Sequence, residues 1–333
     1  MRLMNESILR WPLRPVNTLI DVGRATRRIV CVTALLLLAA GACGAAQDTL
    51  DADEAPPTPA SRARWLPPQV QLLRDLRYGD HERQRLDVYR PAQAQGAATV
   101  FMVHGGGWAH GDKAMDSVVK HKVQAWVPRG VVVVSVNYRL LPQAAPLEQA
   151  RDVARALAFA QSRSAEWGGD PARFVLMGHS AGAHLVALLD ATPALAAEAG
   201  ATRWLGSVLL DSAALDVPAL MQARHLRLFD RAFGRDPAAW HAASPWHRLA
   251  ARGAPLLAVC STRRDEACAQ ARRHVEKAQS FGSRASVLPQ DLSHRDINLQ
   301  LGEPGAYTGA VESFLRSLDA GLDATLSAAA PPL

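Results

Sequence analysis

Short apolar runs alternate with longer helical stretches along most of this chain, and this alternation constrains the fold more than any other feature. The runs at 98–103 and 131–136 are almost continuously apolar, which is typical of strands buried on both faces of a sheet. The alternating segment 86–89 predicts a strand before them, and weaker or shorter runs follow at 174–177, 207–210, 256–260 and 285–288. Helical patterns lie at 113–127, 147–163, 181–191, 266–281 and 308–321. This order predicts an α/β fold with a mostly parallel, doubly wound sheet flanked by helices. Ligands of such sheets bind at the carboxyl ends of the strands.

The charge balance gives little support to a nucleic-acid partner. The chain has 333 residues, of which 49% are apolar, and a net charge of +6. Six arginines against Glu6 and Asp21 give residues 1–42 a charge of +4, which leaves +2 for the remainder. No basic run with interleaved aromatic residues follows.

The N-terminal 42 residues have the pattern of an export signal. Arg24, Arg27 and Arg28 precede an apolar run at 29–40, which is shorter than the roughly 20 residues of a membrane span. The segment 40–43 resembles a bacterial lipoprotein box that ends in Cys43, with alanine where leucine is usual. Lipidation of Cys43, ordinary cleavage near position 42 or 46, and an uncleaved anchor all remain open. We therefore expect an exported protein, periplasmic or lipid-anchored to the cell envelope.

The rest of the chain divides into a linker, one domain and a tail. Proline and acidic residues make 43–68 a flexible linker, 69–322 form the α/β domain, and 323–333 form a flexible tail. Only Cys260 and Cys268 certainly remain after the signal is removed. In an oxidising compartment they form a disulfide or stay as two buried thiols, and the sequence leaves both alternatives open.

A nucleophile motif follows the apolar run at 174–177. The sequence Gly178-His179-Ser180-Ala181-Gly182 fits G-x-S-x-G and precedes a helical stretch. This strand–turn–helix context holds the serine hydroxyl above the sheet at the N-terminus of a helix. Ser180 is therefore the predicted nucleophile.

A glycine-rich loop follows the run at 98–103. His104-Gly105-Gly106-Gly107-Trp108 resembles the H-G-G-G and H-G-G-x-W loops of hormone-sensitive-lipase-like and related carboxylesterases of the α/β-hydrolase superfamily. The resemblance covers roughly 78–320 and includes Asn137-Tyr138-Arg139-Leu140. It implies an oxyanion hole made by the amides of Gly106, Gly107 and Ala181, with His104 fixing the loop. Neither a phosphate-loop nor a dinucleotide-binding spacing is present.

The family order of nucleophile, acid and base directs the choice of the remaining catalytic residues. His294 follows the last predicted strand and is the expected base, whereas His274 lies within a helix and is expected at the surface. By resemblance the acid lies after the strand at 256–260, where Asp265 is the prediction and Glu266 the alternative. Asp296 is interpreted as a loop-stabilising carboxylate. This chemistry needs no metal or cofactor, and the histidine and cysteine spacing offers no zinc site.

The segment 211–246 is too long for a simple crossover and predicts a small inserted cap. Trp108 and His179 are tentative additions to the substrate pocket. Together these features predict a serine carboxylesterase that hydrolyses small acyl or aryl esters through an acyl-enzyme intermediate, with a small-molecule ester as its ligand. An arylformamidase resembling kynurenine formamidase is the alternative enzyme, and a non-catalytic binding module is the alternative of another class. The oligomeric state is not predicted.

Overall fold

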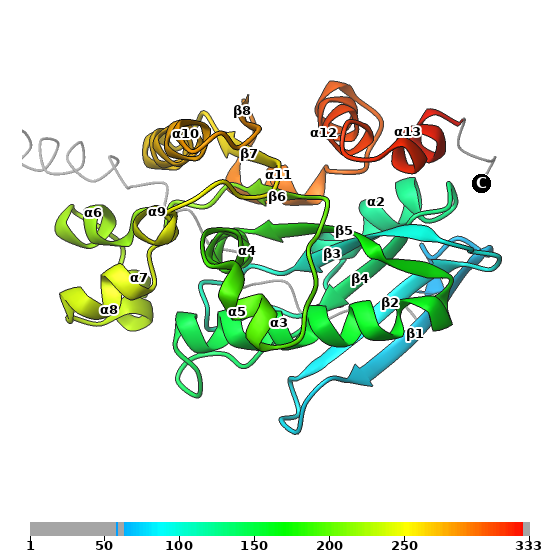
Figure 1. Ribbon diagram of the computed structural model, residues 1–333, viewed down its shortest axis with the longest axis horizontal. Coiled ribbons are helices and arrows are strands. Elements are labelled where there is room, and N and C mark those ends of the chain that lie inside the picture. The colour runs from blue at the N-terminus through cyan, green and yellow to red at the C-terminus, as the bar shows by residue number, and fades with distance from the viewer. Residues whose placement is uncertain (1–57, 59–62, 329–333) are drawn as a thin grey trace, which may run out of the picture. The chain divides into compact units, whose positions relative to one another are not determined.

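The computed structural model describes residue 58 and residues 63–328 (Figure 1). The predicted signal, Cys43 and most of the predicted linker lie outside these described residues. No helix within the described part is long and apolar enough to cross a membrane.

A single eight-stranded sheet forms the centre of the domain, with the strand order β1-β2-β4-β3-β5-β6-β7-β8. The first two strands pair antiparallel with each other, and β2 pairs antiparallel with β4, whereas the other pairings are parallel. The mostly parallel sheet predicted from the sequence is confirmed. The strands are β1 (Val70–Arg77), β2 (Arg85–Pro91), β3 (Ala97–Val103), β4 (Val132–Val136), β5 (Gly169–His179), β6 (Gly206–Leu210), β7 (Leu256–Ser261) and β8 (Ala285–Gln290).

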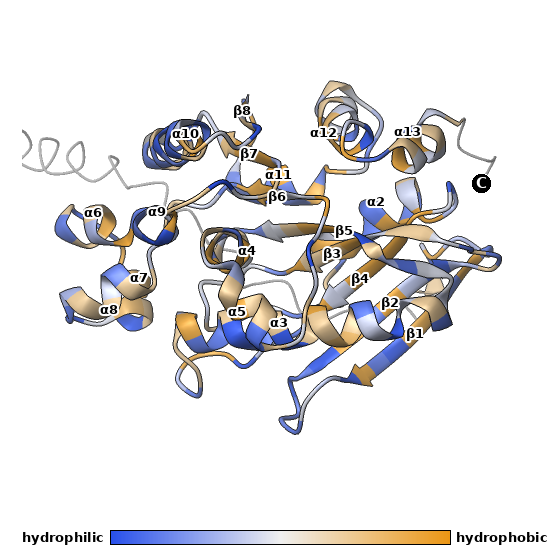
Figure 2. Ribbon diagram, viewed as in Figure 1, coloured by the Kyte–Doolittle hydropathy of each residue, from blue (hydrophilic) through white to orange (hydrophobic). Residues whose placement is uncertain are grey.

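Helices cover both faces of this sheet, so successive residues of the central strands enter different cores. Phe101 packs in one apolar cluster with α3, α4 and α10, and its neighbour Met102 packs in the other with α2, α11, α12 and α13. Figure 2 shows the apolar residues concentrated on the central strands. The covering helices are α2 (Asp116–Trp126), α3 (Pro146–Arg163), the 3-10 turn η1 (Ser164–Trp167), α4 (Ala181–Ala191), α5 (Pro193–Glu198), α10 (Asp265–Ser280), α11 (His294–Leu299), α12 (Ala306–Arg316) and α13 (Ala320–Ser327).

The predicted cap folds as four short helices between β6 and β7. They are α6 (Val217–Gln222), α7 (Arg227–Phe233), α8 (Pro237–Ala242) and α9 (Pro245–Arg248), and they gather at one end of the domain in Figure 1. Local sequence starts two of them: Asp216 accepts a hydrogen bond from the amide of Ala219, and Asp236 accepts one from Ala238. A proline follows within the first two positions of each of these helices, where its missing N–H costs nothing.

The folded region extends beyond the predicted domain at both ends. Trp65, placed in the linker by sequence, is nearly buried, donates its Nε1–H to Asp116 at 2.9 Å and stacks on Tyr89. Leu326, placed in the flexible tail, is buried on α13. Both residues contribute apolar surface to the same core, which explains why the ordered chain continues through them.

Candidate active site

Ser180 occupies a sharp turn between β5 and α4. Its φ of 55° and ψ of −117° lie in a region that side-chain-bearing residues rarely adopt. The flanking glycines are required because the backbone is crowded: a methyl group on Gly178 would lie 2.4 Å from the carbonyl oxygen of Gly182, and one on Gly182 would lie 2.2 Å from that of Val103. The amide of Ser180 donates to the carbonyl of Leu210 on β6 at 2.8 Å, which fastens the turn to the neighbouring strand.

Three side chains form a hydrogen-bonded chain at the carboxyl edge of the sheet. His294 Nε2 lies 2.9 Å from Oγ of Ser180, and His294 Nδ1 lies 2.6 Å from Oδ2 of Asp211. A carboxylate can only accept, so Nδ1 carries the proton and Nε2 is left with a lone pair toward the serine hydroxyl. Asp211 is fully buried, whereas Ser180 remains partly exposed, so the chain runs from the interior to an accessible hydroxyl.

The prediction of Asp265 as the carboxylate that orients His294 is wrong, because Asp211 occupies that position. Asp265 begins α10, and the alternative Glu266 is exposed. Asp211 follows β6 directly, and β6 is the neighbour of the nucleophile strand, so the two side chains start close together. From the sequence, Asp211 was predicted only to start the cap. Its place directly after the apolar run at 207–210, which corresponds to the place of the Ser180 motif after the run at 174–177, is the signal that could have identified it.

Two further donors hold the Asp211 carboxylate. The amide of Ser261 donates to Oδ1 at 2.8 Å, and Arg264 Nη1 donates to Oδ2 at 2.5 Å. Burial by itself raises the pKa of Asp211, but the hydrogen bond from His294 and the charge of Arg264 outweigh it and leave this pKa well below its usual range. The carboxylate is therefore ionised at any pH at which the protein is expected to work.

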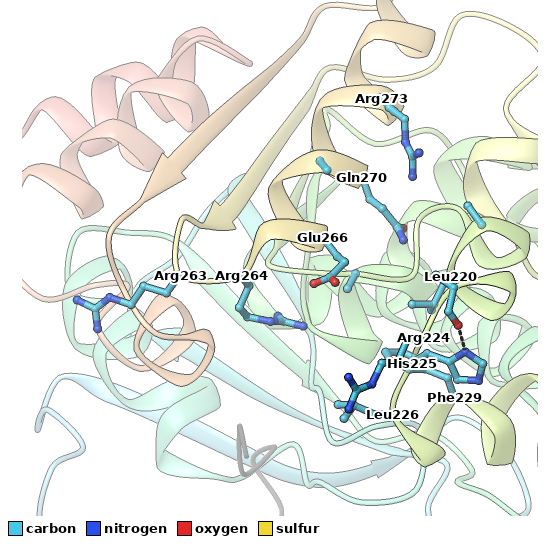
Figure 3. A pocket seen from close by; sticks show the side chains of 14 residues that line it. Leu220, Arg224, His225, Leu226, Phe229, Arg263, Arg264, Glu266, Gln270 and Arg273 are labelled. Atoms are coloured by element: carbon cyan, nitrogen blue, oxygen red, sulfur yellow. Dashed lines mark hydrogen bonds between the residues drawn. The ribbon is translucent and has the colours of Figure 1, made fainter. Parts of the chain in front are cut away.

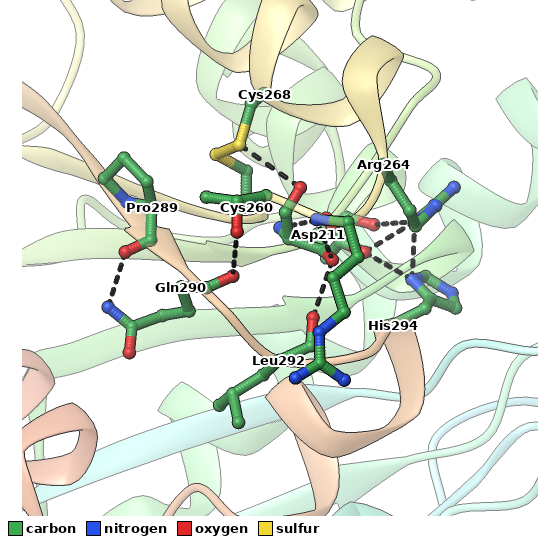
Figure 4. Close-up of a disulfide and its surroundings, with 11 residues drawn as sticks. Asp211, Cys260, Arg264, Cys268, Pro289, Gln290, Leu292 and His294 are labelled. Carbon is green, nitrogen blue, oxygen red and sulfur yellow. Dashed lines mark hydrogen bonds and ion pairs between the residues drawn. A yellow bond between two sulfur atoms is a disulfide. The ribbon is translucent and has the colours of Figure 1, made fainter.

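A disulfide closes the segment that carries these two donors. Cys260 and Cys268 are bonded, with a sequence separation of 8, so the open alternative of two free thiols is settled. Figure 4 shows Asp211, Arg264 and His294 beside this bond. Within the closed loop, the Ser261 hydroxyl also donates to the carbonyl of Leu292 at 2.6 Å, two residues before His294. The loop therefore contacts both the buried carboxylate and the segment that carries the imidazole.

The glycine-rich loop lies against the nucleophile turn. A methyl group on Gly105 would be 3.0 Å from Cβ of Ser180, and the next three residues, Gly106, Gly107 and Trp108, all have positive φ. In the described part of the chain, the amides of Gly106 and Gly107 have no backbone acceptor. Ala181 is the first residue of α4, where helical N–H groups also lack an intrahelical partner. The glycine loop thus lies against Ser180, and the N–H groups of the three predicted oxyanion donors have no backbone acceptor in the described part of the chain.

His104 holds this loop from beneath. Its ring stacks on Tyr138 at 4.5 Å, and the Tyr138 hydroxyl donates to the His104 carbonyl at 2.9 Å. Arg83 donates to the carbonyls of Tyr138 and Gly111 on either side. Burial, assisted by the charge of Arg83, lowers the pKa of His104 to about 4, so the ring is neutral. These contacts explain the role of Tyr138 in the segment after β4.

His179 and Trp108, the tentative pocket residues, are both buried, and His179 borders a small void that it shares with His104, Gly105 and Gly106. His179 is fully buried; its Nε2 donates to the carbonyl of His294 at 3.0 Å and its ring lies 4.5 Å from the His294 ring. Trp108 is 2% exposed, donates Nε1–H to Nδ1 of His184 at 3.2 Å, and packs edge-on against Phe233 of the cap at 4.9 Å. His179 therefore supports the imidazole, and Trp108 joins the glycine loop to the cap.

A cavity with a volume of about 650 Å³ lies between the cap and the start of α10 (Figure 3). Arg264 connects it to the Asp211–His294 pair. Helix α7 connects it to the glycine loop, because Phe229 lines the cavity and Leu228 faces Gly107. The cavity therefore adjoins both the Asp211–His294 pair and the helix that faces the glycine loop.

Comparison with known proteins agrees with this architecture. The BD-FAE family model matches residues 86–202, which include the glycine loop and the nucleophile turn. Esterase B of Lactobacillus rhamnosis superposes with a TM-score of 0.62 at 20% identity, covering 79% of this chain and 88% of that one. The chain has the α/β-hydrolase fold. An esterase of Thermogutta terrifontis gives this hydrolase fold a second match, with a TM-score of 0.59 at 23% identity over 74% of this chain and 90% of that one.

Several proteins that are similar to this chain in sequence are named as esterases. Esterase LipC of Mycobacterium tuberculosis is 30% identical over 269 residues, which cover 74% of this chain and 65% of LipC. A probable isoprenylcysteine alpha-carbonyl methylesterase of Arabidopsis thaliana is 38% identical over 117 residues, 35% of this chain and 24% of that protein. The chain spans about a quarter to a third of the length of the first curated relatives it matches.

Proposed function

We propose that this α/β-hydrolase is a serine carboxylesterase that cleaves small acyl or aryl esters. One observation carries the proposal: the Ser180–His294–Asp211 chain of hydrogen bonds lies beside the glycine loop, where the amides of Gly106 and Gly107 have no backbone acceptor in the described residues. We expect these amides, with that of Ala181, to form the oxyanion hole. A hydroxyl, a base with the correct tautomer and donors for a developing oxyanion are the groups that acyl transfer requires. The esterase names of the relatives support the same reaction class.

The reaction follows from the tautomer of His294. Nε2 takes the proton of the Ser180 hydroxyl as its oxygen attacks the ester carbonyl, and the negative charge that moves to the carbonyl oxygen is stabilised by the loop amides. The imidazolium then protonates the departing alcohol, which leaves an acyl group on Ser180. Water enters, gives its proton to Nε2, and attacks the acyl carbon. The carboxylic acid leaves as Ser180 recovers its proton, and Asp211 stabilises the imidazolium at both stages.

The proposal is tested with 4-nitrophenyl acetate and butyrate on the purified mature domain. We expect turnover that Ser180→Ala abolishes while circular dichroism and melting temperature stay as in the wild type. A serine-reactive alkyl phosphonate should label the wild type at one site and leave the variant unlabelled. Wild-type protein that is folded, hydrolyses neither ester and resists the phosphonate would favour a binding module instead.

The formamidase alternative is decided in the same assay. N-formylkynurenine is offered beside 4-nitrophenyl butyrate, and kcat/KM is compared for the two. A carboxylesterase should prefer the ester by at least about tenfold after correction for the uncatalysed rates. A preference for the formamide would replace ester hydrolysis with amide hydrolysis at the same site.

An exported location is part of the proposal. The Cys260–Cys268 disulfide supports it, since such bonds persist mainly in oxidising compartments. The predicted signal and Cys43 lie outside the described residues, so N-terminal sequencing and mass spectrometry of protein recovered from the envelope provide the test. A mature protein that retains Met1 would contradict export by cleavage.

A further inference from the structure

The cavity beside the triad has a cationic lining. Four arginines line it, at positions 224, 263, 264 and 273, against a single carboxylate among its lining residues, that of Glu266. The surrounding sequence has the same bias, because residues 211–275 contain ten arginines, no lysine and six acidic residues. The planar guanidinium group matches a carboxylate with two parallel hydrogen bonds, which an ammonium group cannot provide.

The four arginines differ in how far they are already committed. Arg263 pairs with Asp291 at 2.8 Å, and Figure 3 shows it pointing away from the other lining side chains. Arg264 is bound to Asp211 and forms the boundary with the triad. Two remain for a ligand.

Arg224 and Arg273 are the two arginines that a ligand can reach. Arg224 is exposed and forms no ion pair with any carboxylate in the described part of the chain. Arg273 is half exposed, and its Nη2 lies 3.8 Å from Asp216, too far for a hydrogen bond. Both guanidinium groups can therefore turn to an anion without breaking a close pair.

The remaining lining is apolar and suits the body of a small ester. Leu220, Leu226 and Phe229 come from the cap helices, and Leu226 is one of the two most exposed large apolar side chains of the described residues. The volume of about 650 Å³ lies within the range of small-molecule sites. The cavity thus combines an apolar wall from the cap with the cationic groups of Arg224 and Arg273.

From this lining we infer that the cavity binds a carboxylate carried by the substrate, and that the enzyme prefers anionic esters to neutral esters of the same size. The inference rests on the proposed ester hydrolysis and specifies its substrate class. The carboxylate is held by Arg224 and Arg273, while the ester carbonyl lies at Ser180. Arg264, which lines the cavity and pairs with Asp211, compensates the charge of the Asp211 carboxylate beside the bound anion.

The test compares each anionic ester with a matched carboxamide. 4-Acetoxybenzoate and 4-acetoxybenzamide place the charge on the alcohol side; 4-nitrophenyl hydrogen adipate and 4-nitrophenyl 5-carbamoylpentanoate place it on the acyl side. In at least one pair, kcat/KM divided by the hydroxide-catalysed rate should favour the carboxylate by about tenfold, as expected for two partly exposed ion pairs. The ratio should fall as NaCl is raised, because these pairs are screened.

Variants assign the preference to the two arginines. Arg224→Gln with Arg273→Gln should bring the ratio close to one, whereas Arg272→Gln, the same charge change on the adjacent, exposed position of α10, should keep it. A ratio of one or less in both pairs, or a ratio that the double variant leaves unchanged, overturns the inference. If the neutral esters are still hydrolysed with Ser180 dependence, the proposed function survives that result. Failure to hydrolyse all four esters would overturn both.

Discussion

Nη1 of Arg264 lies 2.5 Å from Oδ2 of Asp211, the same oxygen that accepts the Nδ1 proton of His294 at 2.6 Å. The two donor nitrogens are themselves 2.6 Å apart, so they converge on one acceptor and cannot bond to each other in this tautomer. Asp211 therefore serves two cations during catalysis, the permanent guanidinium and the transient imidazolium. Its position is the feature of the site on which the proposed chemistry depends most.

Asp211→Asn should reduce kcat by about 10³–10⁴-fold, because an amide at this position can donate to Nδ1 and favour the wrong tautomer of His294. The measurement is kcat for 4-nitrophenyl butyrate at neutral pH, with folding checked by circular dichroism. Asp265→Asn is the matched control and should retain activity within about threefold. A comparable loss in Asp265→Asn, with Asp211→Asn still active, would return the acid to the segment after β7.

Gly106→Ala and Gly107→Ala should differ sharply. A methyl group at Gly106 would lie 2.4 Å from the carbonyl oxygen of His110, so the loop must move, and we expect kcat to fall by about 10²–10³-fold. A methyl at Gly107 meets only Leu228, at 3.7 Å, and costs about 1–2 kcal/mol for its positive φ. That variant should keep kcat within about tenfold. Equal losses in both variants would contradict the assigned loop geometry.

Replacing Cys260 and Cys268 together by serine should lower the free energy of unfolding by about 2–3 kcal/mol, the loop-closure value for a short loop. Activity should also fall, since the loop contacts Asp211 and Leu292. The measurements are urea unfolding and kcat without reductant. Dithiothreitol should reproduce both effects in the wild type and change nothing in the variant. An unchanged free energy of unfolding and an unchanged kcat in the variant would exclude a stabilising role of the disulfide.

His274 should make the protein less stable in mild acid. Burial lowers its pKa to about 4, against about 6.5 in the unfolded chain. Between these values the unfolded state binds more protons than the folded state, so the free energy of unfolding decreases as the pH is lowered. From pH 7 to 5 this one group should cost about 2 kcal/mol. His274→Leu should therefore lose about 2 kcal/mol less than the wild type in urea unfolding over that interval, and exposed His241→Gln should behave as the wild type. Identical losses in all three proteins would contradict a neutral, buried His274.

Most of the fold could be predicted because its signals are local. Seven of the eight strands and the main covering helices coincide with apolar runs and helical patterns that the sequence shows directly. Strand β1 was missed because its residues are mostly exposed, as expected of an edge strand, so no continuous apolar run marks it. His274 was placed at the surface, yet α10 buries that face of the helix against the sheet. Periodicity alone does not reveal which polar residues a helix buries.

Site residues that belong to a sequence motif could be predicted, because the motif implies a local backbone geometry. The catalytic acid could not, because the sequence indicates only its order in the chain relative to the nucleophile and the base. Ser180, His294 and the glycine loop each follow a strand, and the structure brings them together. The identity of the acid depends on which strand end lies next to the His294 imidazole. Asp211 and Asp265 both lie between Ser180 and His294 in the chain, so the family order of nucleophile, acid and base does not distinguish them. Only the adjacency of β5 and β6 in the sheet, together with the hydrogen bond to Nδ1, distinguishes them.

Trp108 directly follows the predicted oxyanion donors Gly106 and Gly107, and its indole packs against Phe229 and Phe233 of the cap. A change in the cap that alters this packing is therefore also expected to shift the backbone amides of Gly106 and Gly107. In the proposed esterase, substrate selectivity and turnover are therefore coupled through Trp108. A cap taken from another protein will function here only if it supplies aromatic side chains that pack against the Trp108 indole.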